Sequence, residues 1–121
     1  MYKRQVFIGS FEVIKIYPLV TCLSNVDRHK IASSYGFGPK VKEYGKLDLK
    51  LGYIVTRKLK KVMRVDSDKQ DAFYLDLKQG LDTMLNKGGF IIDDIHLGNV
   101  LYDEERGKFV WNDFDLSLIH I

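Results

Sequence analysis

The sequence predicts an α+β fold, because its strand-like and helix-like segments are grouped along the chain rather than alternating. Strand patterns dominate the N-terminal half, with one short helix inserted among them. A long amphipathic pattern then covers residues 66–89, and short strand-like runs follow it. A doubly wound sheet would need strands and helices in regular alternation, so we do not expect one.

The first strand is predicted at residues 11–17, where the run FEVIKIY is rich in β-branched and aromatic residues. A short helix is expected to follow over residues 24–34. Ser24 or Asn25 is the expected N-cap, since both side chains can accept a hydrogen bond from the first turn. Gly36 or Gly38 is expected to end this helix.

Two strand-like runs, residues 39–47 and 51–59, predict a β-hairpin. The first run alternates apolar and polar residues, and the second is apolar in its middle. Gly45 is predicted to form the turn, since glycine is common where the backbone reverses.

The strongest helical pattern is the segment 66–89, with the helix itself expected over residues 67–87. Ser67 is the expected N-cap, and acidic residues follow in the first turn. Glycines at positions 88 and 89 are expected to end the helix. One apolar stripe recurs at helical spacing, formed by Phe73, Leu77, Leu81 and either Met84 or Leu85.

Three short strands are predicted after this helix, at residues 90–92, 99–103 and 108–113. The last two are joined by DEERG, in which Gly107 permits a tight turn. They therefore predict a second hairpin.

The densest group of chemically active side chains lies in residues 93–117, DDIHLGNVLYDEERGKFVWNDFDLS. Phosphoryl transfer from a nucleotide needs a carboxylate to take the proton of the acceptor, oxygen ligands for Mg²⁺ and a cation on the phosphates. Asp94 and Asn99 have the spacing D-x-x-x-x-N that such a loop uses. Asp113 follows one hairpin later and can return to the same site. A solvated acidic turn is the alternative interpretation.

The sequence DIHLGNVLY…FVWNDFD resembles the catalytic loop and metal-binding turn of the protein-kinase-like superfamily. It is most similar to the branch with D-x-H-x-x-N, which includes aminoglycoside phosphotransferases, choline kinases and fructosamine kinases. Leu97 stands where that branch usually has proline.

This resemblance implies a role for each residue of the motif. Asp94 would be the catalytic base, and His96 would help to position either the phosphate or Asp94. Asn99 would be part of the catalytic loop and a metal ligand, and Asp113 would be the main metal ligand. Asp115 competes with Asp113 for that role, but the order Asp-Phe favours Asp113.

The upstream half of the chain also resembles this superfamily. The VIK of FEVIKIY is similar to the strand that carries the phosphate-binding lysine, which implies that role for Lys15. The run GYIVTRKL falls where the hinge binds adenine, around Val55, Thr56 and Arg57. No glycine-rich loop precedes Lys15. The short helix offers no glutamate as its partner, and Asp27 is the candidate acid there.

The resemblance implies a partial protein-kinase-like fold. Residues 6–57 would form an incomplete N-terminal β lobe. Residues 58–115 would form the start of the helical C-terminal lobe, with the catalytic loop and metal-binding turn. A truncated core of this kind is expected to be inactive, with the apolar stripe of its long helix partly exposed.

The two ends of the chain are expected to be non-native. MYKRQ and LSLIH can be back-translated into DNA sequences that are reverse complements of each other, and this DNA resembles a transposon end used in sequencing libraries. Residues 1–5 and 116–121 are therefore interpreted as adapter-derived, and the chain as a metagenomic fragment.

The leading hypothesis is an ATP- and Mg²⁺-dependent phosphotransferase acting on a hydroxyl-bearing small molecule or a protein. A pseudokinase that only binds nucleotide is the first alternative. A metal-dependent hydrolase is the second, and it would use Asp93, Asp94, His96 and Asp113.

Composition excludes some other classes. The net charge of +3 is too small to indicate nucleic-acid binding, and no apolar run approaches the roughly 20 residues of a membrane helix. The single cysteine, Cys22, forms no disulfide framework and indicates a reducing compartment. The expected location is the cytoplasm, or the cytosol of a host if the protein is a delivered effector.

Overall fold

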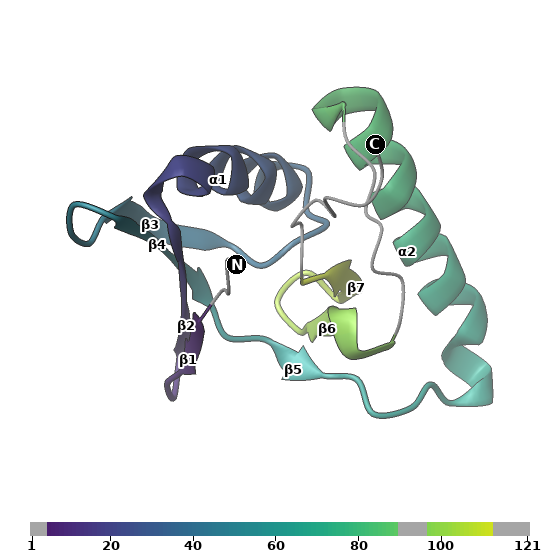
Figure 1. Ribbon diagram of the computed structural model, residues 1–121. Helices are drawn as coiled ribbons and strands as arrows, with labels where there is room; N and C mark the ends of the chain where they lie inside the picture. The colour runs from purple at the N-terminus through teal and green to yellow at the C-terminus, as the bar shows by residue number, and fades with distance from the viewer. Residues whose placement is uncertain (1–4, 90–96, 113–121) are drawn as a thin grey trace.

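The chain folds into two antiparallel sheets and two main helices (Figure 1). The structure is a computed structural model and describes residues 5–89 and 97–112. The first sheet has the order β1-β2-β4-β3, and the second has the order β5-β6-β7. This arrangement confirms the predicted α+β class.

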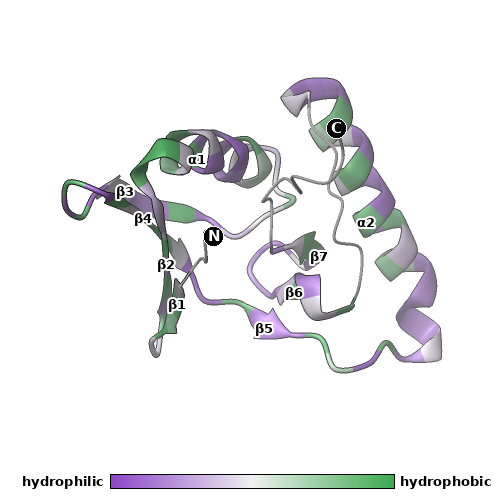
Figure 2. Ribbon diagram, viewed as in Figure 1, coloured by the Kyte–Doolittle hydropathy of each residue, from purple (hydrophilic) through white to green (hydrophobic). Residues whose placement is uncertain are grey.

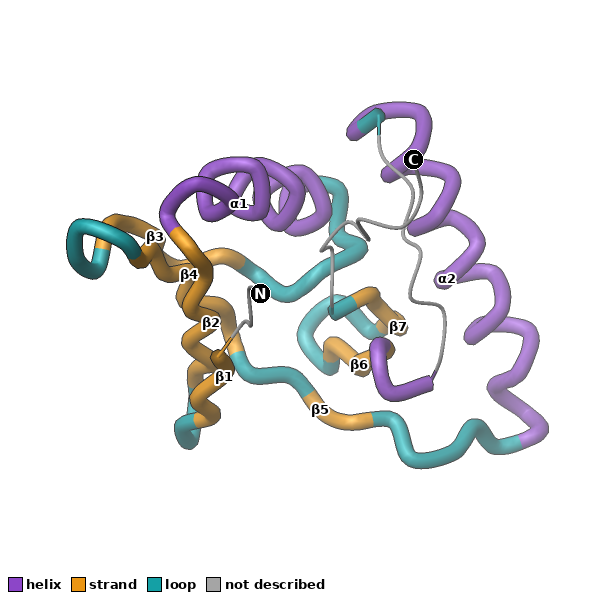
Figure 3. Tube along the Cα trace, in the orientation of Figure 1, coloured by secondary structure: helices purple, strands orange, loops and turns teal. Residues whose placement is uncertain are grey.

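The elements of the first part are β1 (Gln5–Ile8), β2 (Glu12–Pro18), α1 (Leu19–Ser34), β3 (Val41–Lys46) and β4 (Leu51–Arg57). Those of the second part are β5 (Lys60–Lys61), α2 (Gln70–Thr83), β6 (Val100–Asp103) and β7 (Lys108–Trp111). Helix α1 lies against the first sheet, and α2 packs on β7 of the second (Figure 1). The segment between β5 and α2 runs mostly as a loop (Figure 3).

Helix α1 begins at Leu19, five residues earlier than predicted. The expected N-cap residues, Ser24 and Asn25, lie inside the helix, so that prediction is wrong. Pro18 takes the N-cap position with φ −56°. Proline therefore both ends β2 and leads into the helix, where its fixed φ is compatible with the first turn. Gly36 follows the helix with φ 80°, as predicted.

The predicted hairpin forms from β3 and β4, but its turn is not at Gly45. Gly45 lies within β3, where a Cβ would come 3.2 Å from the ring of Tyr53. The turn is built on Asp48, whose Oδ1 accepts hydrogen bonds from the backbone N–H groups of Lys50 at 2.7 Å and Leu51 at 2.8 Å. Aspartate stabilises turns in this way, so the hairpin is confirmed and its turn residue is corrected.

The long helix is confirmed, with irregular ends. A 3₁₀ turn at Ser67–Lys69 precedes α2, and a π turn at Met84–Gly88 follows it. Ser67 is the first residue of that 3₁₀ turn rather than an N-cap, and Asp66 precedes it. Gly89 ends the helical region with φ 70°.

The apolar stripe of α2 packs against the second sheet and is only partly covered by it, in agreement with the partial exposure predicted. Phe73, Leu77 and Leu81 are half-buried, and the rings of Phe73 and Phe109 lie 5.0 Å apart. Figure 2 shows green and purple bands alternating along α2, as in an amphipathic helix. The buried core that the stripe contacts consists of Ala32, Phe37, Met84, Val100, Phe109 and Trp111.

Trp111 fixes the position of α2 on β7. Its indole Nε1 donates a hydrogen bond to the carbonyl of Leu77 at 3.1 Å, and its side chain is 2% exposed. The backbone N–H of Phe109 donates to Asp76 of the same helix at 3.0 Å. Gly80 faces the indole directly, and a Cβ there would lie 2.9 Å from Cδ1 of Trp111.

Arg106, in the turn between β6 and β7, ties the second sheet to the end of α1 and to the loop that follows it. Its guanidinium donates to the carbonyl of Gly38 at 2.6 Å and to that of Ser33 at 3.0 Å. Asp103, which is buried, lies 3.3 Å from the same guanidinium. These bonds hold the C-terminal end of α1 against the β6–β7 hairpin.

Within residues 5–89 and 97–112, no helix combines the length and the apolar character that crossing a bilayer requires.

Candidate functional site

Lys15 projects from β2 into the interior, where it is 2% exposed. Its Nζ lies 2.7 Å from the backbone oxygen of Asn112, 3.5 Å from Oδ1 of the same residue and 3.1 Å from Nε2 of His29. Side chains alternate along a strand, so Ile14 and Ile16 face the other way, and Ile14 is 40% exposed. A buried lysine needs polar partners, and these include His29 of α1 and Asn112, which follows β7.

Asn99 and Asn112 meet at the open end of the second hairpin. The strand register pairs Val100 with Trp111, and the backbone N–H of Asn112 donates to the carbonyl of Asn99 at 3.0 Å. Asn99 is buried, and Lys15 contacts Asn112 from the first sheet. The structure therefore brings Lys15, Asn99 and the residue before Asp113 together. Five other candidates lie outside the described residues, and their roles stay predictions: Asp93, Asp94, His96, Asp113 and Asp115.

A cavity of about 430 Å³ opens beside Lys15. Val13 lines it from the first sheet and Leu101 from the second, so its walls include apolar side chains from both sheets. Its volume falls in the range of small-molecule sites. The remaining lining residues are Val6, Ile8, Lys58, Leu59, Lys60, Lys61 and Asn112.

Val55, Thr56 and Arg57, the predicted adenine-binding segment, are not among the residues that line this cavity. They lie in β4, which pairs with a strand on each side, and the backbone N–H of Arg57 donates to the carbonyl of Lys40 at 2.9 Å. The next three residues, 58–60, line the cavity instead. The strand pattern of the sequence continues through residues 58 and 59, so the sequence did not show that β4 ends at Arg57.

The side chain of Arg57 forms an ion pair with Glu105 in the β6–β7 turn. The hydrogen bond and the positive charge of Arg57 lower the pKa of Glu105. Both side chains are substantially exposed, so this pair contributes little to stability on its own. It adds a further contact between the two sheets.

His29 of α1, rather than Asp27, lies against Lys15. Asp27 is exposed on the outer face of the helix. Nδ1 of His29 lies 2.7 Å from the backbone oxygen of Asn25, one turn earlier, and its ring meets that of Tyr17 edge-on. The sequence analysis missed this residue. A helical stripe could have shown it, because the buried positions of α1 recur every three or four residues, at Cys22, Val26, His29 and Ala32.

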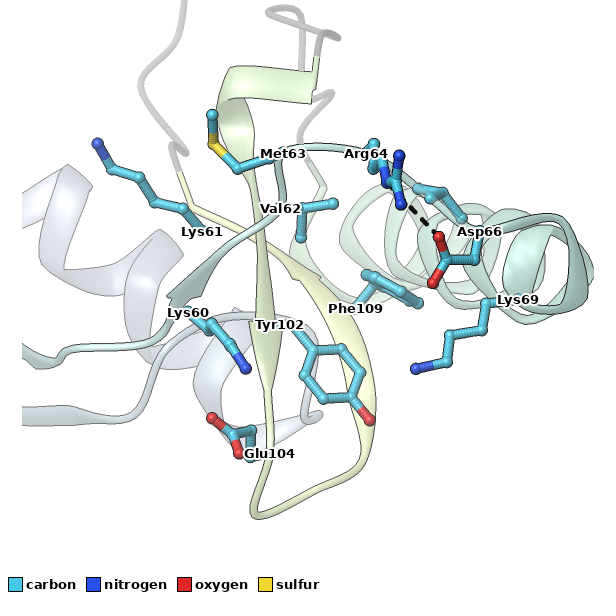
Figure 4. A pocket seen from close by; sticks show the side chains of 11 residues that line it. Lys60, Lys61, Val62, Met63, Arg64, Asp66, Lys69, Tyr102, Glu104 and Phe109 are labelled. Atoms are coloured by element: carbon cyan, nitrogen blue, oxygen red, sulfur yellow. Dashed lines mark ion pairs between the residues drawn. The ribbon is translucent and has the colours of Figure 1, made fainter.

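A second cavity, of about 310 Å³, lies beside β5 and the start of α2 (Figure 4). Its walls combine basic, acidic and apolar side chains, and Arg64 forms an exposed ion pair with Asp66 at 3.6 Å on one of them. It contains none of the predicted site residues, so the cavity beside Lys15 is the candidate site. The basic residues that line the second cavity are Lys60, Lys61, Arg64 and Lys69.

The part of the chain that the structure describes contains no group of three or more histidine, cysteine, aspartate or glutamate residues able to hold a metal ion. The predicted metal site therefore depends on Asp113 together with Asn99.

Comparison with solved structures shows which fold these elements form. The kinase PK-1 of Cydia pomonella granulovirus is similar over 93% of this chain and 52% of its own, with a TM-score of 0.63 and 16% sequence identity. Monomeric WbdD is similar over 89% of this chain and 31% of its own, with a TM-score of 0.52 and 23% identity. WbdD bound to the kinase inhibitor LY294002 gives a TM-score of 0.51 at 20% identity.

These similarities define the class of the fold. The chain has a protein-kinase-like fold, and it spans about half of PK-1 and about a third of WbdD. No protein-family model matches the sequence, and no curated protein sequence does. The predicted partial kinase-like fold is thus confirmed by structural similarity.

Proposed function

We propose that this chain is the nucleotide-binding and catalytic core of an ATP-dependent phosphotransferase, which transfers the γ-phosphate to a hydroxyl group. The observation that carries this proposal is the buried Lys15, which lines a cavity of about 430 Å³ and bonds to Asn112, the residue before Asp113. The structural neighbours, which include kinases, support the same class.

The lining of the cavity favours one orientation for ATP. The adenine would lie between the apolar side chains of Val13 and Leu101, alongside the segment 58–60. The phosphates would then reach Lys15, whose charge is the expected counter-ion for them. Asn112 marks the end of the cavity at which the phosphates would lie.

The donors near Lys15 suit Mg²⁺, which prefers oxygen ligands. Asn99 and Asp113 would hold the ion, and Asn99 is already fixed next to Asn112 by the backbone bond between them. Bound Mg²⁺ would neutralise charge on the phosphates. Asp94 would accept the proton of the acceptor hydroxyl, and His96 would help to orient the reacting groups. The acceptor would be a small molecule or a protein.

A lysine substitution tests the nucleotide site. Mg·ATP should raise the melting temperature of the chain, because a ligand that binds only the folded state stabilises it. Lys15→Met should weaken Mg·ATP binding about tenfold or more, the scale of one charge-assisted contact. Lys42→Met is the matched control, since Lys42 is an exposed lysine that pairs with Glu12 on the surface. Equal binding by wild type and Lys15→Met, measured by calorimetry, would contradict the proposal.

A nucleotide-binding scaffold without catalysis is a second candidate, and one observation favours it. His29 stands against Lys15, where the kinase resemblance leads one to expect an acid. Release of ADP by the parent protein that contains this core, in the presence of an acceptor library, distinguishes the two candidates. The phosphotransferase should lose turnover but keep Mg·ATP binding in Asp94→Asn, whereas a scaffold has no turnover to lose.

A further inference from the structure

We propose that His29 is the positioning residue for Lys15, and that it acts as a neutral hydrogen-bond acceptor where an acid would act as an ion-pair partner. The proposal deepens the function given above and rests on it for the effect on nucleotide binding. The contact itself can be tested without any nucleotide.

The hydrogen bonds of the ring assign its tautomer. Nδ1 lies 2.7 Å from the backbone oxygen of Asn25, and a carbonyl oxygen can only accept, so Nδ1 carries the hydrogen. In a neutral imidazole, Nε2 is then left with its lone pair. That atom lies 3.1 Å from Nζ of Lys15, so it accepts a hydrogen bond from the ammonium group.

His29 and Asn112 hold Lys15 between the two sheets. Asn112, at the end of β7, accepts at 2.7 Å, and His29 of α1 accepts at 3.1 Å. A lysine side chain has four flexible carbon–carbon bonds, so ordering its ammonium group in one place carries an entropic cost. Because these two acceptors already order the ammonium group, its conformational entropy is lost before the nucleotide binds. The positive charge is therefore pre-organised for the phosphates.

A histidine makes this contact sensitive to pH, which an acid would not do above pH 6. A protonated ring has no acceptor at Nε2, and it would place a second positive charge beside the ammonium of Lys15. The titratable groups that the described part of the chain places against the ring are Lys15 and Tyr17, both from β2. Asn112 adds only neutral oxygens on the far side of the lysine. The contact is therefore present at higher pH and is lost as the pH falls and His29 becomes protonated.

The first test is NMR of the chain labelled with ¹⁵N-histidine. His29 should show a protonated Nδ1 and a bare Nε2 at neutral pH, and the Nε2 resonance should shift in Lys15→Met. A protonated Nε2 at neutral pH, or no response to Lys15→Met, would overturn the proposal whether or not the chain binds ATP.

The second test compares two replacements of similar size. His29→Gln keeps a neutral acceptor and should bind Mg·ATP within about twofold of wild type, whereas His29→Met lacks the acceptor and should bind about tenfold more weakly. Asp27→Asn, on the exposed face of the same helix, should have no effect. Circular dichroism checks that each variant is folded.

The pH profile separates positioning from simple packing. As the pH is lowered, wild-type affinity should fall relative to that of His29→Gln, because protonation of the ring removes its acceptor. The ratio of the wild-type affinity to the His29→Gln affinity does not depend on the protonation of the nucleotide, which is the same for both proteins. If wild type binds and the Gln and Met variants match it at every pH, the proposed function stands and the role of His29 fails. If wild type does not bind, the proposed function fails and the NMR result alone decides.

Discussion

Gly80 occupies a position in α2 where only a hydrogen fits. A Cβ at this site would lie 2.9 Å from Cδ1 and 3.0 Å from Nε1 of Trp111. The indole cannot move away easily, because it is buried and donates a hydrogen bond to the carbonyl of Leu77.

Gly80→Ala should therefore destabilise the chain despite the better helix propensity of alanine. Overpacking costs about 1–3 kcal/mol, and the propensity gain of about 1 kcal/mol offsets only part of it. Urea denaturation should show a lower midpoint. Gln79→Ala, an exposed neighbour on the same helix, is the control and should leave the midpoint nearly unchanged. A more stable Gly80→Ala would show that α2 can shift away from β7.

Single residues of the site differed in how well the sequence predicted them. The sequence FEVIKIY correctly predicted that Lys15 lies on a strand. The direction of its side chain relative to Ile14 and Ile16 also followed, because side chains alternate along a strand. The helical stripe of α1 could have shown that His29 is buried, but its pairing with Lys15 depends on how the helix packs on the strand, and no local pattern contains this information. His29 was therefore missed, and the exposed Asp27 was considered instead.

At the scale of elements, the β6–β7 hairpin is held to α1 mainly by its turn. The guanidinium of Arg106 bonds to two backbone carbonyls at the end of that helix, those of Ser33 and Gly38. Hydrogen bonds from a charged donor are among the stronger ones. Arg106 thus sets the distance between the helix that carries His29 and the hairpin that carries Asn112.

Arg106→Ala should destabilise the chain by about 1–3 kcal/mol, since it leaves partly buried carbonyls without their donor. Arg106→Lys should recover only part of this loss, because an ammonium group lacks the fork that reaches both carbonyls. Chemical denaturation provides the measurement. Arg64→Ala is the control, because Arg64 is exposed and its ion pair with Asp66 is expected to contribute little. If both alanine variants behaved alike, the turn would not be a structural tie.

Periodicity and turn signals predicted most elements, but not all of their boundaries. Both hairpins and the order of the predicted elements followed from local patterns, whereas β1 (Gln5–Ile8) and the short β5 (Lys60–Lys61) were not predicted. The start of α1 did not, because Pro18 suits both the end of a strand and the beginning of a helix. Partial exposure of the α2 stripe was predicted correctly, because the second sheet covers only part of it.

At the scale of the whole molecule, the first sheet has an apolar edge. Strand β1 is the outer strand in the described sheet and pairs with β2. Phe7 is paired with Ile14 in the register, and these side chains are 55% and 40% exposed. Phe11, in the turn that follows β1, is 79% exposed. An open strand edge with apolar side chains favours association between copies.

Phe7→Lys should reduce self-association of the chain, since a lysine on an edge strand opposes pairing. Light scattering over a range of concentrations should show a smaller rise in mass for the variant than for wild type. Nucleotide binding should be unchanged, because Phe7 points away from the cavity that Val6 and Ile8 line. Tyr74→Lys, on the exposed face of α2, is the control. If Tyr74→Lys reduced self-association as much as Phe7→Lys does, the association would not be specific to the edge strand β1.

The chain passes from the first sheet to the second only once within the described residues, through the two positions between Arg57 and Lys60. A proteolytic cut at this link would separate the sequence into two peptides, each containing one sheet. The peptides would still share the bonds of Lys15 and Arg106 and a common apolar core. The molecule is therefore suited to fragment complementation, in which recovery of the folded state from two separate peptides reports directly on the strength of the contact between the lobes.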